Sequence, residues 1–160
     1  MNASPPFIIT VFSVTRCCEE VEPVKKLAVV VTRGSYNNIL QACELVRIAA
    51  AAGTQVSVLF RDEAASKLTN EKVKDLVFSD AYKGRESKVR DMLRERKRDH
   101  LPTILREIKE TGDVKFSICR DSIEYFELTV DQLLPELDEV QKAEAFWKEE
   151  IAQADQVLTF

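Results

Sequence analysis

Apolar and polar positions alternate in blocks along most of this chain. Four short runs rich in apolar residues predict strands, and the continuous run at 27–32 is typical of a strand buried on both faces of a sheet. They lie at 27–32, 55–60, 114–118 and 156–160. Between them, apolar residues recur at every third or fourth position, which is the spacing of amphipathic helices. Strands that alternate with helices in this way predict an α/β fold, with three layers and helices on both faces of a mainly parallel sheet.

The expected helices differ in length and in the signals at their ends. Long helices are expected at about 36–52, 103–111 and 143–152, and short ones at 62–68, 71–78, 121–127 and 130–134. Thr103 is the expected cap of one long helix, while Gly53 and Gly112 are expected to end two of them. Phe146 and Trp147 are expected to pack together in the core.

The segment 83–99 contains eight basic and four acidic residues. Its spacing predicts a charged helix with Val89, Met92 and Leu93 on the inner side. Two interpretations of the charge stay open, a solvated helix face and a surface that binds an anion or an acidic partner. No aromatic residue stands among these cations to stack on bases, so single-stranded nucleic acid is not an expected ligand.

The first 24 residues form a separate N-terminal extension, and the α/β domain spans 25–160. Within the extension, the apolar run at 7–14 predicts a strand that suits pairing with a sheet edge or a neighbouring subunit. This run is too short to span a membrane, and no basic residue precedes it as a secretion signal requires. We therefore expect a cytoplasmic protein with free thiols.

The composition narrows the classes of function. The chain has 160 residues, 45% of them apolar, with 23 Lys and Arg against 27 Asp and Glu. These values are ordinary for one globular domain, and the net charge of −4 disfavours a dedicated nucleic-acid binder. His100 is the only histidine and the four cysteines form no CxxC pair. We therefore expect no metal site, no histidine-based catalysis and no organic cofactor.

Among the cysteines, Cys119 is the candidate nucleophile. It ends a predicted strand and opens a predicted helix, where unpaired backbone N–H groups favour a thiolate, and Arg120 follows it. A buried structural thiol is the alternative interpretation, and it stays open at this point. Cys43 lies on the inner face of the first long helix and is expected in the core.

Two sequence stretches resemble the DsrE/DsrF-like sulfur-relay proteins, in particular the DsrE2-like or peroxiredoxin-like branch. The first runs from Met92 through Pro102-Thr103, and the second reads Gly112-Asp-Val-Lys-Phe-Ser-Ile-Cys119-Arg-Asp-Ser122. The resemblance covers about residues 25–160. It implies the DsrE-like fold and a homo-oligomer, with sulfur donor and acceptor proteins or small persulfides as partners.

The resemblance also implies that Cys119 is the sulfur-carrying cysteine, which takes up sulfane sulfur as a persulfide and passes it to another thiol. Ser122 matches a position of the family pattern near this cysteine, and with Arg120 it is a candidate substrate contact. Two departures stand out: Glu127 replaces a usual glycine, and Asp121 adds a negative charge near the thiol.

Two rival hypotheses remain. In the first, the chain is a non-catalytic binding or scaffold subunit of an oligomeric DsrE-like complex that uses its cationic segment 83–98. In the second, it is a thiol peroxidase, in which Cys43 resolves an oxidised Cys119.

Overall fold

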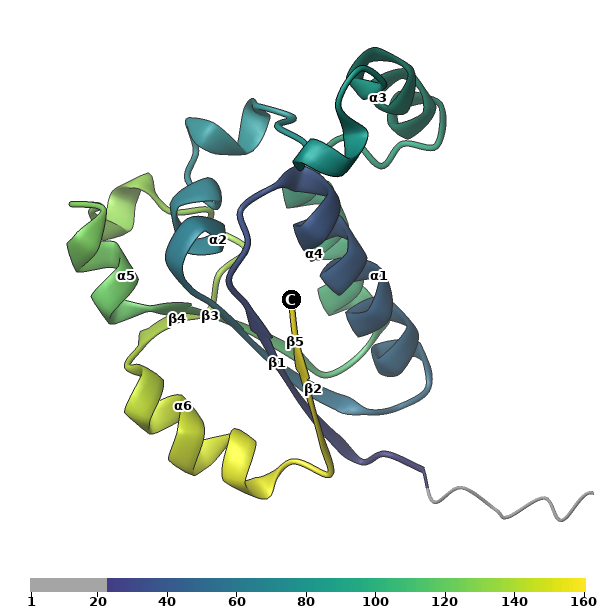
Figure 1. Cartoon of the computed structure of the whole chain (residues 1–160). Coiled ribbons are helices and arrows are strands. Elements are labelled where there is room, and N and C mark those ends of the chain that lie inside the picture. The colour runs from purple at the N-terminus through teal and green to yellow at the C-terminus, as the bar shows by residue number, and fades with distance from the viewer. Residues whose placement is uncertain (1–22) are drawn as a thin grey trace, which may run out of the picture.

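The computed structural model describes residues 23–160 and shows a five-stranded sheet with helices on both faces (Figure 1). The predicted strand at 7–14, most of the N-terminal extension, and Cys17 and Cys18 lie outside the described residues. The strands are β1 (Lys26–Val31), β2 (Gln55–Phe60), β3 (Val114–Cys119), β4 (Glu139–Gln141) and β5 (Gln156–Thr159). Their order is β4-β3-β2-β1-β5, and all pairs are parallel.

The helices are divided unequally between the two faces of the sheet. The α-helices are α1 (Tyr36–Ala51), α2 (Asp62–Lys67), α3 (Glu86–Glu95), α4 (Leu101–Thr111), α5 (Arg120–Tyr125) and α6 (Ala143–Glu149). Short 3-10 turns lie at Lys72–Lys74, Asp80–Tyr82, Val130–Gln132 and Ile151–Gln153. Helices α1, α2, α4 and α5 cover one face, α6 covers the other, and α3 stands apart from the sheet (Figure 1).

This division follows from the path of the chain. The connections from β1 to β4 step across the sheet in one direction, so right-handed crossovers place their helices on one face. The chain then returns from β4 to β5 on the far side of β1, which places α6 on the opposite face. The predicted three-layer α/β/α fold with a parallel sheet is confirmed.

The two faces of the sheet differ in what they bury. The face under α1 and α4 holds the large apolar core, including Tyr36, Phe60 and Phe116. Under α6 the buried apolar cluster is small and consists of Ala28, Leu59, Cys119 and Phe146.

Several elements differ from the sequence prediction. Strand β4 was missed, and the expected helices at 71–78 and 130–134 are only 3-10 turns. Trp147 was expected in the core but is 60% exposed, whereas Phe146 is buried. Adjacent helical residues point about 100° apart, so a short helix on a single sheet face buries only one of the two.

The ends of α4 also differ from expectation. The N-cap is His100 rather than Thr103, and its Nδ1 accepts a hydrogen bond from the Thr103 backbone N–H at 3.4 Å. Gly112 ends α4 with φ of −174°, so it does not need left-handed backbone. A Cβ there would lie 2.8 Å from the Ala50 carbonyl oxygen, so close packing against α1 requires the glycine. Gly53 has φ of 86°, as predicted.

Candidate functional site

Cys119 is the last residue of β3 and the N-cap residue of α5. Ligands of open α/β sheets bind beyond the carboxyl ends of the strands, so this is the expected edge for a site. The residue has no exposed surface, and its apolar neighbours are Ala28, Leu59 and Phe146. The thiol therefore lies between the sheet and α6.

Arg61 stands beside Cys119 on the neighbouring strand. Phe60 pairs with Ile118 in the parallel register, so the next residues, Arg61 and Cys119, lie opposite each other. Arg61 keeps an extended backbone with φ of −129° and ψ of 167°, and its N–H donates to the Val31 carbonyl at 2.9 Å. Because Leu59 lies in the cluster under α6 and strand side chains alternate, Arg61 faces the same side of the sheet as Cys119.

Ser122 is buried in α5 and contacts the backbone of a neighbouring loop. Its Oγ accepts a hydrogen bond from the Asp62 backbone N–H at 2.8 Å. Asp62 has φ of 49°, in the left-handed region, at the corner where β2 turns into α2. This hydrogen bond ties α5 to that corner.

Arg120 is exposed at the first turn of α5 and has no hydrogen bond or ion pair to any residue of 23–160. The sequence prediction of Arg120 and Ser122 as substrate contacts stays a prediction. Sequence reasoning missed Arg61, because only the strand register brings it next to Cys119.

Cys43 lies on the opposite side of the sheet from Cys119. It is buried in α1 within the large core, whereas Cys119 belongs to the cluster under α6. Burial raises the pKa of the Cys43 thiol to about 12, and the nearby Glu44 adds to this effect. The geometry gives the peroxidase hypothesis no support, since a disulfide needs Cα atoms within roughly 7 Å.

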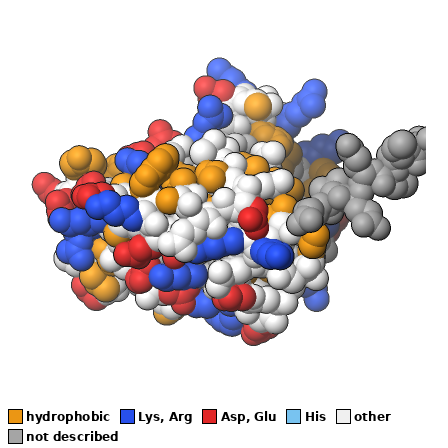
Figure 2. Space-filling view, turned by 90° about the horizontal axis from the view of Figure 1, so that it is seen from below, with side chains coloured by type: hydrophobic (Ala, Val, Ile, Leu, Met, Phe, Trp, Pro, Cys, Tyr) orange, Lys and Arg blue, Asp and Glu red, His pale blue; other side chains and the backbone are white. Residues whose placement is uncertain are grey.

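A polar network fastens the end of α6 to the sheet. The Glu150 carboxylate, at the end of α6, accepts a hydrogen bond from Ser57 Oγ at 2.7 Å and pairs with Lys26 Nζ at 3.2 Å. Lys115 Nζ lies 2.8 Å from Glu139, and the hydrogen bond that Lys115 donates to that carboxylate raises the pKa of Lys115. Seen from below, basic and acidic side chains are interspersed over this face (Figure 2).

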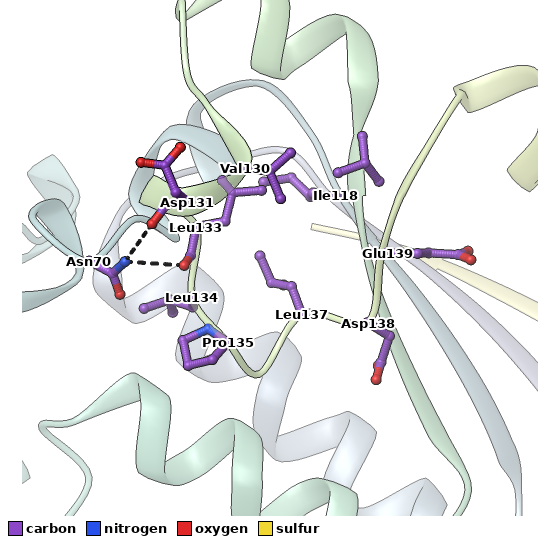
Figure 3. A pocket seen from close by; sticks show the side chains of 11 residues that line it. Asn70, Ile118, Val130, Asp131, Leu133, Leu134, Pro135, Leu137, Asp138 and Glu139 are labelled. Atoms are coloured by element: carbon purple, nitrogen blue, oxygen red, sulfur yellow. Dashed lines mark hydrogen bonds between the residues drawn. The ribbon is translucent and has the colours of Figure 1, made fainter.

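A cavity of about 510 Å³ lies beside β4, on the other face of the sheet from Cys119. Ile118, Val130, Leu133 and Leu137 point toward one another around it, with Asp138 and Glu139 at one side (Figure 3). Asn70 bridges its rim by donating to the carbonyls of Asp131 and Leu133 at 3.3 and 3.2 Å. The sequence predicted a helix at 130–134 and no cavity beside it.

Two further findings concern the described part of the chain. No group of three or more His, Cys, Asp or Glu side chains within 23–160 is arranged to hold a metal ion. None of the helices in this range combines the length and the apolar character that a membrane crossing requires.

Comparison with known proteins identifies the family. The model of the DsrE/DsrF-like family matches residues 25–160. The chain belongs to the DsrE/DsrF-like family. Members of this family are generally related to sulfur relay.

A solved structure with the same DsrE-like fold is that of MTH1491, a protein of unknown function from Methanobacterium thermoautotrophicum. It is 12% identical, with a TM-score of 0.57 over 84% of this chain and 98% of that one. Among curated proteins, none matches the chain.

Proposed function

We propose that this DsrE-like protein is a sulfur carrier, a sulfurtransferase that holds sulfane sulfur as a persulfide on Cys119. The observation that carries the proposal is the position of Cys119 at the carboxyl end of β3 in a chain of this family. That edge of a parallel sheet is where ligands bind.

The reaction consists of two exchanges between sulfur atoms and needs no external oxidant. In the first, the Cys119 thiolate attacks the outer sulfur of a donor persulfide. The new bond joins Sγ to that sulfur, the donor S–S bond breaks, and the donor leaves as a thiolate. In the second, an acceptor thiolate attacks the outer sulfur on Cys119 and releases the Cys119 thiolate.

Burial of Cys119 sets a condition on this chemistry. The thiol lies under Phe146 of α6, so a donor or acceptor thiol reaches it only when α6 moves away from the sheet. Helix α6 has seven residues and buries few apolar side chains, which favours local opening. We infer that transfer depends on this opening.

The test is intact-mass spectrometry after incubation with a small persulfide donor such as glutathione persulfide. We expect the mass to rise by one sulfur atom, about 32 Da, in the wild type and in Cys43→Ser. The same treatment should leave Cys119→Ser unchanged. Equal sulfur gain in Cys119→Ser would contradict the proposal.

We further infer a homo-oligomer, as the family resemblance implies, in a reducing compartment such as the cytoplasm. A free thiol must stay reduced between transfers, which a reducing compartment provides. Native mass spectrometry at micromolar concentration tests the first point, and a monomer alone would contradict it.

A second candidate function is partner binding through the basic segment 83–98. Within the described residues Lys83, Arg85, Lys88, Arg96 and Lys97 have no ion pair and are exposed. Arg94 and Arg98, by contrast, pair with Asp91, Asp99, Glu44 and Glu107. These five cations can therefore bind an acidic protein partner without breaking an ion pair within the protein.

Charge reversal separates the two candidates. Under the binding hypothesis, Lys88→Glu with Arg96→Glu abolishes function in cells while Cys119→Ser leaves it intact. Under the sulfur-carrier proposal the pattern is reversed. Arg98 is a poor choice for this experiment, because its reversal would also break the pairs with Glu44 and Glu107.

A further inference from the structure

We propose that Arg61 is the counter-ion of the Cys119 persulfide, with its guanidinium holding the negatively charged terminal sulfur. This inference rests on the proposed function and assigns a role to a residue on a different strand. Three features of the structure support it: the strand register, the state of the Arg61 side chain, and the surroundings of Cys119.

The register brings the two residues together. Arg61 follows Phe60, which is paired with Ile118, and therefore lies opposite Cys119. Neighbouring strands are about 4.8 Å apart, so the side chains of an aligned pair on one face are in contact range. A persulfide extends the thiol by one S–S bond of about 2 Å, which a long arginine side chain can meet.

The Arg61 side chain has a buried donor without a partner. Its Nε is inaccessible to solvent and makes no hydrogen bond with any described residue, although the side chain as a whole is 38% exposed. Its ion pair with Asp62 Oδ2 spans 3.9 Å, too far for a hydrogen bond. Because a buried donor left unpaired is costly, an anion within reach of Nε would supply the missing partner.

The buried surroundings of Cys119 contain no other group that could serve as its counter-ion. Its buried neighbours Ala28, Leu59 and Phe146 are apolar, and no described residue hydrogen-bonds to its Sγ. A charge in such a place is unfavourable unless a counter-charge is supplied. Arginine suits this task, since it remains protonated at all physiological pH values.

The corner that carries Arg61 is held firmly in place. The Arg61 N–H donates to Val31, and the following N–H of Asp62 donates to Ser122 Oγ. The same serine belongs to α5, which begins directly after Cys119. Ser122 therefore fixes the strand end that presents Arg61 relative to the strand end that presents Cys119.

Arg33 offers a control. It is an exposed arginine two residues after β1, at the same edge of the sheet, and has no part in the proposed site. A role that depended on positive charge in general at this edge would involve Arg33. A role that depends on the pairing of β2 with β3 involves Arg61.

The experiment compares Arg61→Gln, Arg61→Lys and Arg33→Gln in a chain with Cys17, Cys18 and Cys43 replaced by serine. The thiolate absorbance near 240 nm is titrated to give the pKa of Cys119, and the decay of the glutathione-persulfide-loaded form is followed by intact mass. We expect Arg61→Gln to raise the Cys119 pKa by about one unit and to shorten the persulfide lifetime about tenfold. Arg61→Lys should restore part of both values, and Arg33→Gln should match the parent.

Arg61→Gln values within twofold of the parent would overturn the inference, as would equal effects of Arg61→Gln and Arg33→Gln. If the parent fails to load sulfur, the sulfur-carrier proposal fails, and the thiolate titration alone then decides whether Arg61 stabilises an anion at Cys119. Circular dichroism establishes that each variant is folded. If Arg61→Gln does not fold, Arg61→Lys serves as the test variant.

Discussion

Glu127 adopts a backbone conformation that is unfavourable for a residue with a side chain. Its φ is 51°, in the left-handed region that costs a side-chain-bearing residue about 1 kcal/mol relative to glycine. The turn that follows α5 imposes this conformation, which a glycine would adopt without strain. The substitution Glu127→Gly should therefore raise the free energy of unfolding by about 1 kcal/mol, measured by urea denaturation.

The matched control is Glu127→Ala, which removes the same exposed carboxylate but keeps a Cβ. It should leave the free energy of unfolding nearly unchanged. Equal stabilisation by both substitutions would mean that the loss of the carboxylate, rather than the relief of the backbone, causes the gain.

Helix α6 is the element that covers Cys119. Phe146 is buried against Cys119, and Trp147, one residue later, is 60% exposed. Phe146→Ala should lower the free energy of unfolding by about 3 kcal/mol and increase the rate at which iodoacetamide alkylates Cys119 by at least tenfold. Trp147→Ala, on the same helix, should change both quantities little.

Alkylation is followed by mass spectrometry of peptides, with Cys43 as an internal reference on the other side of the sheet. An equal rise in Cys43 alkylation would indicate global unfolding rather than opening of α6. Such a result would contradict the role of α6 as the cover of this site.

Strand β5 is fastened to β1 by a side chain whose charge depends on pH. The Asp155 carboxylate accepts hydrogen bonds from the backbone N–H groups of Lys25 and Lys26 at 2.8 and 2.9 Å. The hydrogen bond from Lys26 and then that from Lys25 lower the pKa of Asp155. A lowered folded-state pKa means that the carboxylate stabilises the fold above its unfolded value and loses this effect as pH falls through the folded value.

We therefore expect Asp155→Asn to lower the melting temperature at pH 7 and to have a smaller effect below pH 3. Thermal unfolding at both values checks this. Glu144→Gln is the control, because Glu144 is exposed and pairs only with Lys148. If Asp155→Asn lowers the melting temperature as much below pH 3 as at pH 7, the stabilisation does not depend on the charge of Asp155.

The elements that the sequence predicted well are those whose own residues determine them. The four runs became β1, β2, β3 and β5, because they concentrate the apolar and β-branched residues that strands favour. Strand β5 lies at the edge of the sheet and is mostly exposed. Strand β4 has only three residues, Glu139-Val140-Gln141, and is formed by pairing with β3. Its short, mostly polar sequence contains no strand signal, so only tertiary structure reveals it.

The same distinction applies to the candidate site. Cys119 was predicted because its place between a strand and a helix can be read locally. Arg61 was not, since its relation to Cys119 depends on the pairing of β2 with β3, 58 residues apart along the chain. A buried thiol was one of the two interpretations that the sequence left open, and Cys119 is fully buried. Its cover by α6 could not be predicted locally, because α6 reaches this face only through the crossover to β5.

At the scale of the whole molecule, the sheet separates the two buried thiols. Cys43 lies in the core between α1 and the sheet, and Cys119 lies between the sheet and α6. A disulfide between them would require the Cα atoms to approach within roughly 7 Å, which the intervening sheet prevents. The burial that raises the pKa of Cys43 to about 12 also makes it a poor nucleophile.

Hydrogen peroxide should therefore leave Cys43 and Cys119 unlinked in the folded protein. The measurement is a non-reducing peptide map after peroxide treatment, in a Cys17→Ser, Cys18→Ser background so that only the two buried thiols remain. The reference is the same protein oxidised in guanidinium chloride, where the unfolded chain is free to form the bridge. A Cys43–Cys119 disulfide that forms as readily in the folded protein would revive the peroxidase hypothesis. It would also require the sheet itself to rearrange, because opening of α6 alone does not bring Cys119 to Cys43 in α1.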